Sequence, residues 1–269
     1  MSLPISIVII TKNEAERLKG CLDSVFGWAD EIILVDDESI DQTRKIAADY
    51  TDKIFVRRMD IEGKHRNWAY AQAKNEWVLS LDADERLTPE LKKEIEELFI
   101  LAIEAPAFAI PRKNFLGNYW LRWAGLYPSA QLKLFKKNKF KWEEVEVHPR
   151  AFLEGKCAYL KSPLLHYTYR DFGNFLKKLN NQTTLEAKKW FDVYKADSKK
   201  ANYKMNLTHA LWRCFDRFLR AYLRKQGWRD GFRGFMVSFF SGLYQIISYA
   251  KYWELKNKYK NSNGKNSFS

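Results

Sequence analysis

Short apolar runs alternate with helix-patterned segments over the first 105 residues or so. The β-branched run at 5–10 is almost continuously apolar, as expected of a strand buried on both faces of a parallel sheet. Similar runs predict three further strands, at 31–35, 53–57 and 77–81. Helical spacing of apolar residues, with a Thr-Pro start at 88–89, predicts helices at 15–25, 41–50, 64–73 and 88–103. This alternation favours an α/β fold with a mostly parallel sheet and right-handed crossovers.

Polar clusters follow three of the predicted strands, at 11–14, 36–39 and 82–85. Ligands of such sheets bind outside the carboxyl ends of the strands, so the clusters are expected to share one edge. The sequence contains no G-x-G-x-x-G or Walker A loop, which argues against a dehydrogenase or a P-loop ATPase. A nucleotide at this edge would be held by carboxylates and a metal.

The last of these clusters holds two aspartates one residue apart, Asp82 and Asp84. At the period of a strand they project to the same side. Burial of unpaired carboxylates costs several kcal/mol each, so they are predicted near water at a strand end. Oxygen ligands of this kind suit Mg²⁺ or Mn²⁺. The alternative for an isolated Asp-x-Asp is a solvated acidic turn.

The middle of the chain has a different texture, with strands predicted at 108–110 and 131–135. The intervening segment 114–128 is rich in aromatic, amide and glycine residues, which fits either a loop that stacks on sugar rings or a surface hairpin. The strand-like segment 141–149 carries candidate general bases or, alternatively, the exposed face of an edge strand. Its chemistry-bearing residues are Glu143, Glu144, Glu146 and His148. His166, among aromatic residues, is interpreted as structural.

From residue 171 the pattern is helical and basic. Four arginines fall in one stripe opposite an apolar face, a pattern typical of a helix in a membrane interface: Arg213, Arg217, Arg220 and Arg224. The apolar stretch 234–250 is at the lower limit for crossing about 30 Å of hydrocarbon. It predicts a re-entrant or in-plane segment rather than a span, with a packed helical pair or a dimer interface as alternatives. The polar tail 257–269 is predicted to be disordered.

Charge is distributed unevenly. Residues 1–110 carry 14 Lys and Arg against 22 Asp and Glu, a net charge of −8, whereas the remainder carries 32 against 11, a net charge of +21. The acidic half would repel a phosphorylated ligand unless a metal reverses the local field. The basic half could meet anionic lipid, a phosphorylated acceptor or nucleic acid.

Cysteine usage and the first residues bear on the compartment. Cys21, Cys157 and Cys214 are scattered, which predicts reduced thiols rather than a disulfide framework or a zinc site. The first predicted strand follows Pro4 directly, so no signal peptide is expected.

Three blocks, 7–14, 35–43 and 81–85, resemble the family 2 glycosyltransferases of GT-A fold. Blocks in the middle of the chain look like the branch that contains lipopolysaccharide-core β-glucosyltransferases: 114–117, 125–128, 131–135, 147–148 and 166–169. The resemblance covers about residues 3–170, and more loosely the basic helices to about 254. Two positions depart from the family pattern, Ser129 in place of an acidic residue and Pro149 in place of a glutamate.

The resemblance implies inverting transfer of a hexose such as glucose from a nucleoside-diphosphate sugar, with a UDP-sugar as the expected donor. The acceptor would be a hydroxyl of a cell-envelope glycolipid or polysaccharide, and Mg²⁺ or Mn²⁺ would assist. Thr11, Asn13 and Glu14 would line the nucleoside pocket and Asp37 would meet the base. Asp82 would reach the ribose or the diphosphate and Asp84 the metal.

Further roles follow from the same resemblance. Arg66 and Asn67 would lie along the donor. The base is one of Glu143, Glu144 and Glu146, because the usual glutamate is replaced at Pro149. The expected acceptor-binding residues are Trp120, Tyr127 and His148.

The expected organisation is a GT-A domain over 1–170, with a donor part at 1–110 and an acceptor part at 111–170, then a basic membrane-associating helical region at 171–256. The protein is expected at the cytoplasmic face of the inner membrane, peripheral or monotopic, with an anionic membrane surface and no nucleic acid as partner. Two alternatives remain: sugar transfer to a polyprenyl phosphate carrier, and a non-catalytic scaffold bound to a membrane or to nucleic acid.

Overall fold

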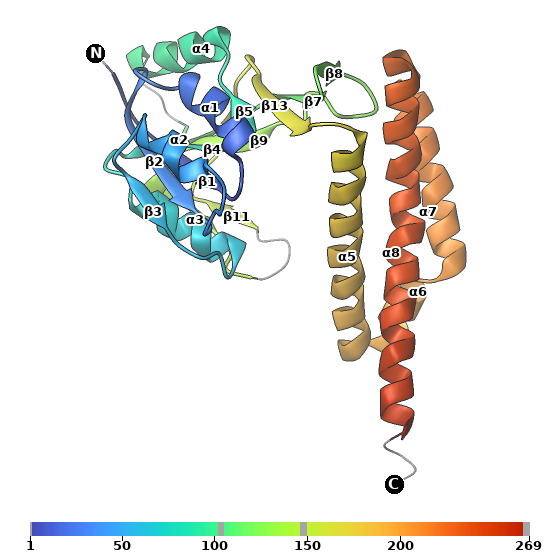
Figure 1. Ribbon diagram of the computed structural model, residues 1–269. Coiled ribbons are helices and arrows are strands. Elements are labelled where there is room, and N and C mark those ends of the chain that lie inside the picture. Colours follow the sequence, from blue (N-terminus) through green and yellow to red (C-terminus); the bar gives the residue numbers. More distant parts are fainter. Residues whose placement is uncertain (1, 102–104, 146–149, 266–269) are drawn as a thin grey trace. The chain divides into compact units, whose positions relative to one another are not determined.

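The computed structural model describes residues 2–101, 105–145 and 150–265, which form two compact units (Figure 1). The sheet unit comprises Met1–Phe115 and Tyr127–Thr168, and the helical unit comprises Leu116–Leu126 and Tyr169–Ser269. Residues 116–126, which the sequence placed in the acceptor part of the first domain, therefore belong to the helical unit.

A seven-stranded sheet in the order β12-β6-β9-β4-β1-β2-β3 forms the centre of the sheet unit. Its strands are β1 (Leu3–Thr11), β2 (Ala29–Asp36), β3 (Ile54–Val56), β4 (Trp77–Asp82), β6 (Ala107–Ile110), β9 (Gln131–Lys136) and β12 (Cys157–Tyr159). β9 runs antiparallel to β4 and β6, whereas the other pairings described for this sheet are parallel. The predicted α/β fold with a mostly parallel sheet is confirmed.

Alternating side chains of β1 serve two cores, as the apolar run predicts. Ile7 and Ile9 pack on one face with Leu18 and Leu22, while Val8 packs on the opposite face with other residues, and all five are fully buried. The first face is covered by α1, α2 and α4, and the second by α3. These helices are α1 (Ala15–Asp23), α2 (Thr43–Ala48), α3 (Glu62–Ala71) and α4 (Pro89–Ile100).

Smaller strands surround the main sheet. β5 (Glu85–Arg86), β13 (Leu164–Tyr169) and β7 (Arg112–Leu116) lie in a second sheet, and β10 (Phe140–Trp142) pairs with β11 (Ala151–Leu153) after a short helical turn at Lys137–Lys139. β7 is followed by a turn at Gly117, where φ is +56°, and by β8 (Tyr119–Leu121). The first part of the segment 114–128 thus forms a strand, a turn and a strand, whereas residues 122–128 form neither helix nor strand; whether the segment stacks on sugar rings stays a prediction.

The helical unit is built from α5 (Phe172–Ala196), α6 (Ser198–Lys204), α7 (Leu207–Leu219), a π-helical turn (Arg220–Arg224), a 3₁₀ turn (Gly227–Asp230) and α8 (Gly231–Lys265). α8 runs alongside α5 and α7 (Figure 1). The stretch 234–250 lies within α8 and approaches α7 closely: a Cβ on Gly242 would lie 2.6 Å from the carbonyl oxygen of Cys214. This stretch therefore contributes to helix packing.

Two expectations about the C-terminal half need comment. No helix within the described ranges is both long enough and apolar enough to cross a membrane. α8 continues through Lys265, where the sequence predicted a disordered tail from 257. Extending an existing helix needs no new nucleus, and the Glu254–Lys258 pair, at 2.7 Å, supports its last turns.

Candidate active site

The carboxyl ends of β1, β2 and β4 meet at one edge of the sheet. Thr11 stands opposite Asp36 in the β1–β2 pairing, and Ile10 stands opposite Asp82 in the β1–β4 pairing. The three polar clusters predicted to share an edge therefore do so.

Hydrogen bonds join the loop after β1 to the loop after β2. Asn13, with a left-handed φ of +52°, donates its backbone N–H to Ser39 Oγ at 2.8 Å and accepts from the Ile40 N–H at 2.9 Å through its amide oxygen. The Glu14 N–H donates to Thr43 Oγ1 at 2.9 Å. Asn13 and Glu14 thus hold the two loops together, whatever further contact they make with a ligand.

Thr11 and Asp37 lie next to this junction, where the Asp37 N–H donates to the Thr11 carbonyl at 2.9 Å. The Thr11 hydroxyl is buried and has no hydrogen-bond partner among the described residues. Asp37 accepts from Lys12 Nζ and from the Met59 N–H, both at 2.8 Å. Burial would raise the pKa of Asp37, but these hydrogen bonds outweigh it and lower the pKa. Asp37 is therefore a fixed, ionised acceptor.

Asp82 and Glu85 share a buried cation, Lys133 of β9. Lys133 Nζ lies 2.8 Å from Asp82 Oδ2 and 2.6 Å from Glu85 Oε2, and the lysine side chain is 5% exposed. Burial alone would raise the pKa of Asp82 and lower that of Lys133, but their mutual attraction outweighs it in both cases. For Glu85, burial and repulsion from Asp82 prevail and raise the pKa.

Two expectations about the Asp-x-Asp pair are corrected here. β4 ends at Asp82 and Asp84 lies in the following turn, so the period of a strand does not relate them. The carboxylates are also not unpaired: Lys133 and Arg66 contact Asp82, and Arg17 contacts Asp84. Lysine and arginine side chains, in addition to any metal, therefore offset the negative charge at this edge.

Asp84 faces a histidine. Its Oδ2 lies 3.2 Å from Arg17 Nη1, its Oδ1 lies 3.5 Å from His166 Nε2, and its carboxylate is 12% exposed. The other ring nitrogen of His166, Nδ1, lies 2.7 Å from the amide oxygen of Asn114. These contacts are compatible with the structural role expected for His166, and they also place its ring next to the predicted metal ligand.

Side chains of α3 contact both the end of β4 and the segment at the end of β10. Arg66 Nη2 lies 3.4 Å from Asp82 Oδ1, and the Arg66 guanidinium lies 5.9 Å from the centre of the Trp142 ring. Asn67 donates from Nδ2 to the Trp142 carbonyl at 2.9 Å and to Glu144 Oε1 at 3.1 Å. Consecutive residues of one helix thus contact the donor-side aspartate and a candidate base.

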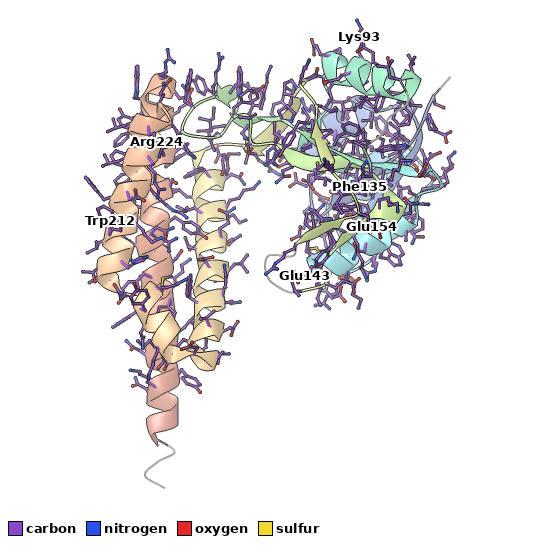
Figure 2. All side chains as sticks on the ribbon, turned by 180° about the vertical axis from the view of Figure 1, so that it is seen from behind. Lys93, Phe135, Glu143, Glu154, Trp212 and Arg224 are labelled. Carbon is purple, nitrogen blue, oxygen red and sulfur yellow. The ribbon has the colours of Figure 1, made fainter. Side chains whose placement is uncertain are left out.

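The remaining candidates are placed as follows. Glu143 accepts from the Arg150 N–H at 3.2 Å and lies at the margin of the sheet unit (Figure 2). Glu146 and His148 fall outside the described residues. Tyr127, joined to Pro128 by a cis peptide bond, belongs to the sheet unit, whereas Trp120 lies in β8 of the helical unit. The acceptor-binding roles stay predictions.

Sequence reasoning missed three groups at this edge: Arg17, Lys133 and the Asn114–His166 pair. One signal was available for Lys133, since a lysine in the middle of the apolar strand 131–136 must find a buried partner. Ser129, which departs from the family pattern, accepts from Arg112 Nε at 3.1 Å through its carbonyl oxygen, and Arg112 Nη1 lies 3.7 Å from Glu85.

Comparison with known proteins gives a consistent result. Residues 6–153 match the family described as Glycosyl transferase family 2. The chain is 27% identical over 259 residues to the lipopolysaccharide core biosynthesis glycosyltransferase LpsC of Rhizobium meliloti (strain 1021), covering 94% of this chain and 93% of LpsC. It is 30% identical over 268 residues to the uncharacterized glycosyltransferase RP128 of Rickettsia prowazekii (strain Madrid E), covering 96% of this chain and 89% of that protein.

The chain is also similar to a solved structure of S. aureus TarS, residues 1–349 in complex with UDP. The match covers 97% of this chain and 92% of the TarS chain, with 15% sequence identity and a TM-score of 0.47. The family match extends over more than half of the sequence and contains β1, β2, β4 and the carboxylate edge. The chain therefore belongs to glycosyl transferase family 2 and is a transferase with a GT-A type sheet unit.

Proposed function

We propose that the protein transfers a hexose from a nucleoside-diphosphate sugar, a UDP-sugar in the first instance, to a hydroxyl of a cell-envelope glycolipid or polysaccharide, with inversion and with the help of Mg²⁺ or Mn²⁺. The observation that carries the proposal is the edge where Asp82, Asp84 and His166 lie together with three basic side chains. The relationship to a lipopolysaccharide core biosynthesis enzyme supports the choice of acceptor class.

The donor set around Asp84 fits a divalent cation. A histidine that binds a metal through Nε2 donates its Nδ1–H to a neighbour, and the amide oxygen of Asn114, 2.7 Å from His166 Nδ1, would accept that proton. In that tautomer Nε2 and Asp84 Oδ1, 3.5 Å apart, would be two ligand atoms for one cation. Mg²⁺ is commonly held by one or two side chains together with substrate phosphates, and Asp84 and His166 could supply the protein part of such a set.

Charge control at the leaving group is the chemistry that a cation would supply there, since negative charge builds on the diphosphate as it departs. Arg66 and Lys133 would add fixed positive charge on the Asp82 side. Asp37 would accept a hydrogen bond from the nucleoside, and the Thr11 hydroxyl could donate or accept one, because both residues border the same edge.

The proton of the acceptor must be removed by a carboxylate. The acceptor oxygen bonds to the anomeric carbon, the bond from that carbon to the diphosphate oxygen breaks with its electron pair, and the hydroxyl proton passes to the base. Glu144 suits this role best of the described candidates, because Asn67 orients it and Arg66, the preceding residue, contacts Asp82. Glu143 is instead directed to the backbone of Arg150.

The test is transfer by the full chain from UDP-glucose, in the presence of Mn²⁺, to a deacylated lipopolysaccharide core or to a polyprenyl phosphate in vesicles. We expect a β-linked product with the core acceptor. Glu144→Gln should lower kcat by about 10²–10⁴-fold with unchanged affinity for UDP, while Glu143→Gln serves as the matched control. Full kcat in the Glu144→Gln protein would exclude this residue as the base, and transfer only to the polyprenyl phosphate would exclude the saccharide acceptor.

The same proposal places the protein at the cytoplasmic face of the inner membrane. α7 carries exposed Leu211, Trp212 and Phe215, and Figure 2 shows Trp212 on this helix. Exposed aromatic residues next to arginines are the composition of an interfacial helix. Binding of the full chain to vesicles of anionic lipid should be lost in the Trp212→Ala/Phe215→Ala protein; equal binding by that variant would remove the basis for α7 as the contact.

A further inference from the structure

The helical unit contains a cavity to which the proposed sugar transfer assigns no role. It has a volume of about 550 Å³ and is lined by four basic side chains together with three small residues. The basic residues are Arg217, Arg220, Arg224 and Lys225. Three of the four arginines in the stripe that the sequence shows thus line one open cavity; Arg217 is half-buried, and Arg220 and Arg224 are exposed.

A wider helical turn shapes this cavity. After α7 the chain forms a π-helical turn over Arg220–Arg224, closed by a hydrogen bond of 2.8 Å from the Lys225 N–H to the Arg220 carbonyl. π-Turns cost stability and are found frequently at functional sites. The carbonyl of Lys225 itself accepts a hydrogen bond of 3.0 Å from the Ala124 N–H, and Ala124 also lines the cavity.

Glycine is required next to the cavity at one position. Gly125 has a φ of +82°, and a Cβ there would lie 2.6 Å from Cδ of Lys225. The Lys225 stem therefore packs directly against the Gly125 backbone. The positive φ favours glycine at this position, and the absence of a side chain leaves room for the Lys225 stem.

The charges of the cavity are poorly balanced. Its lining includes no acidic residue, and within the described ranges Asp216 forms an ion pair with Arg220 but no carboxylate pairs with Arg224 or Lys225. Burial, and then repulsion from Arg213, lower the pKa of Arg217. Like charges held at one site without counter-charges are unfavourable, so an anion in the cavity would relieve the repulsion.

We propose that this cavity binds a phosphate group. Arginine offers planar, bidentate hydrogen bonds that match phosphate oxygens, and three arginines plus a lysine can neutralise a phosphate monoester fully. The volume falls within the range of about 300–1,000 Å³ typical of small-molecule sites, which leaves room for the group that carries the phosphate. The phosphate belongs either to a soluble phosphorylated saccharide or to a lipid headgroup.

The proposal is tested on the full chain without nucleotide or metal, so it stands or falls independently of sugar transfer. Binding of inorganic phosphate and of glucose 6-phosphate is followed by phosphorus NMR line broadening. Sedimentation with phosphatidylcholine vesicles, with and without phosphatidic acid, tests the headgroup. Arg220→Gln/Arg224→Gln should weaken phosphate binding about tenfold or more, because two charged hydrogen-bond donors are lost.

Matched variants separate a site from general charge. Lys177→Gln/Lys188→Gln removes the same two charges from exposed positions of α5 and should leave phosphate affinity within about twofold of the parent protein. The single variant Arg224→Lys keeps the charge without the planar fork and should show a partial loss. Because Arg224 is exposed, this variant is expected to fold even if the double variant does not.

Each outcome decides something. If the cavity variants lose soluble phosphate binding but keep phosphatidic acid binding, the site is supported and takes a soluble ester. If they lose both, it is supported and takes a headgroup as well. If the parent protein binds neither probe, or if the Lys177/Lys188 variant loses as much affinity as the Arg220/Arg224 variant, the proposal is overturned.

Discussion

Replacing Lys133 with methionine is the most direct probe of how the carboxylate edge is held. Lys133 Nζ lies 2.8 Å from Asp82 and 2.6 Å from Glu85. At such separations each attraction amounts to about 6 kcal/mol at an effective dielectric constant of about 20. Desolvation of the buried charges offsets most of this, so the free energy of unfolding of the sheet unit should fall by about 3–5 kcal/mol in Lys133→Met.

Hydrogen exchange of the β1 and β4 amides measures this loss in the sheet unit alone, since both strands lie at its centre. Lys136→Met is the matched control on the same strand. Lys136 pairs with Glu76 at 3.1 Å, but 31% of the lysine and 53% of the glutamate side chain are exposed. Its loss should therefore cost less than about 1 kcal/mol.

The pH dependence gives a second signature. Without Lys133, the pKa of Glu85, already raised in the parent protein, rises further. A carboxyl whose pKa is raised binds protons in the folded state before the unfolded state does, so the variant regains stability as the pH falls towards the ordinary glutamate pKa of about 4.3. Adding Glu85→Gln should recover part of the loss at the higher pH. A cost equal to that of Lys136→Met, or one that does not change with pH, would refute the reasoning.

Three further predictions concern other contacts of the sheet unit. Burial, and then the charge of Arg57, lower the pKa of His65. The stability that the neutral ring contributes is therefore present above about pH 6.5 and is lost as the pH falls. His65→Gln should flatten the decline in Tm between about pH 7.5 and 5.5, and an unchanged slope would contradict this. Gly63→Ala places a Cβ 2.0 Å from the Glu143 carbonyl oxygen and should lower the free energy of unfolding in urea by about 1–3 kcal/mol; an unchanged free energy would contradict this. Thr88→Ala removes the hydrogen bond of 3.1 Å that the Leu91 N–H donates to the Thr88 hydroxyl at the N-cap of α4. Amide exchange at the start of α4 should become about fivefold faster, which corresponds to about 1 kcal/mol, and unchanged exchange would show that the cap contributes nothing.

Local patterns were sufficient for the elements of the donor half. The run at 5–10 became β1 and the Thr-Pro start at 88–89 became the N-terminus of α4, because side-chain periodicity and capping act within a few residues. The position of β9 between β4 and β6 could not be predicted, since strand pairing over such a separation leaves no local trace.

The site was predictable on one side only. The carboxylates end apolar strands, and that position is visible in the sequence. Their partners come from distant segments: Lys133 lies 51 residues after Asp82, and Arg17 lies 67 residues before Asp84. An argument about unpaired carboxylates therefore gave the right place and the wrong electrostatics.

The arginine stripe shows a related limit. Its spacing in the sequence indicates one helical face, but the π-helical turn and the contact between Gly125 and Lys225 decide that the face becomes a cavity. Neither feature has a sequence signature, and the second joins two segments that lie a hundred residues apart in the chain.

The central claim is that Asp84 and His166 hold a divalent cation beside the diphosphate of a nucleotide donor. Calorimetric titration of UDP into the full chain, with and without Mn²⁺, tests it directly. We expect Mn²⁺ to strengthen UDP binding. Asp84→Asn and His166→Gln should each lower the affinity for UDP in the presence of Mn²⁺ by about tenfold or more, and should leave the affinity without metal unchanged. UDP binding of equal strength with and without Mn²⁺, or the full gain retained in both variants, would contradict the account.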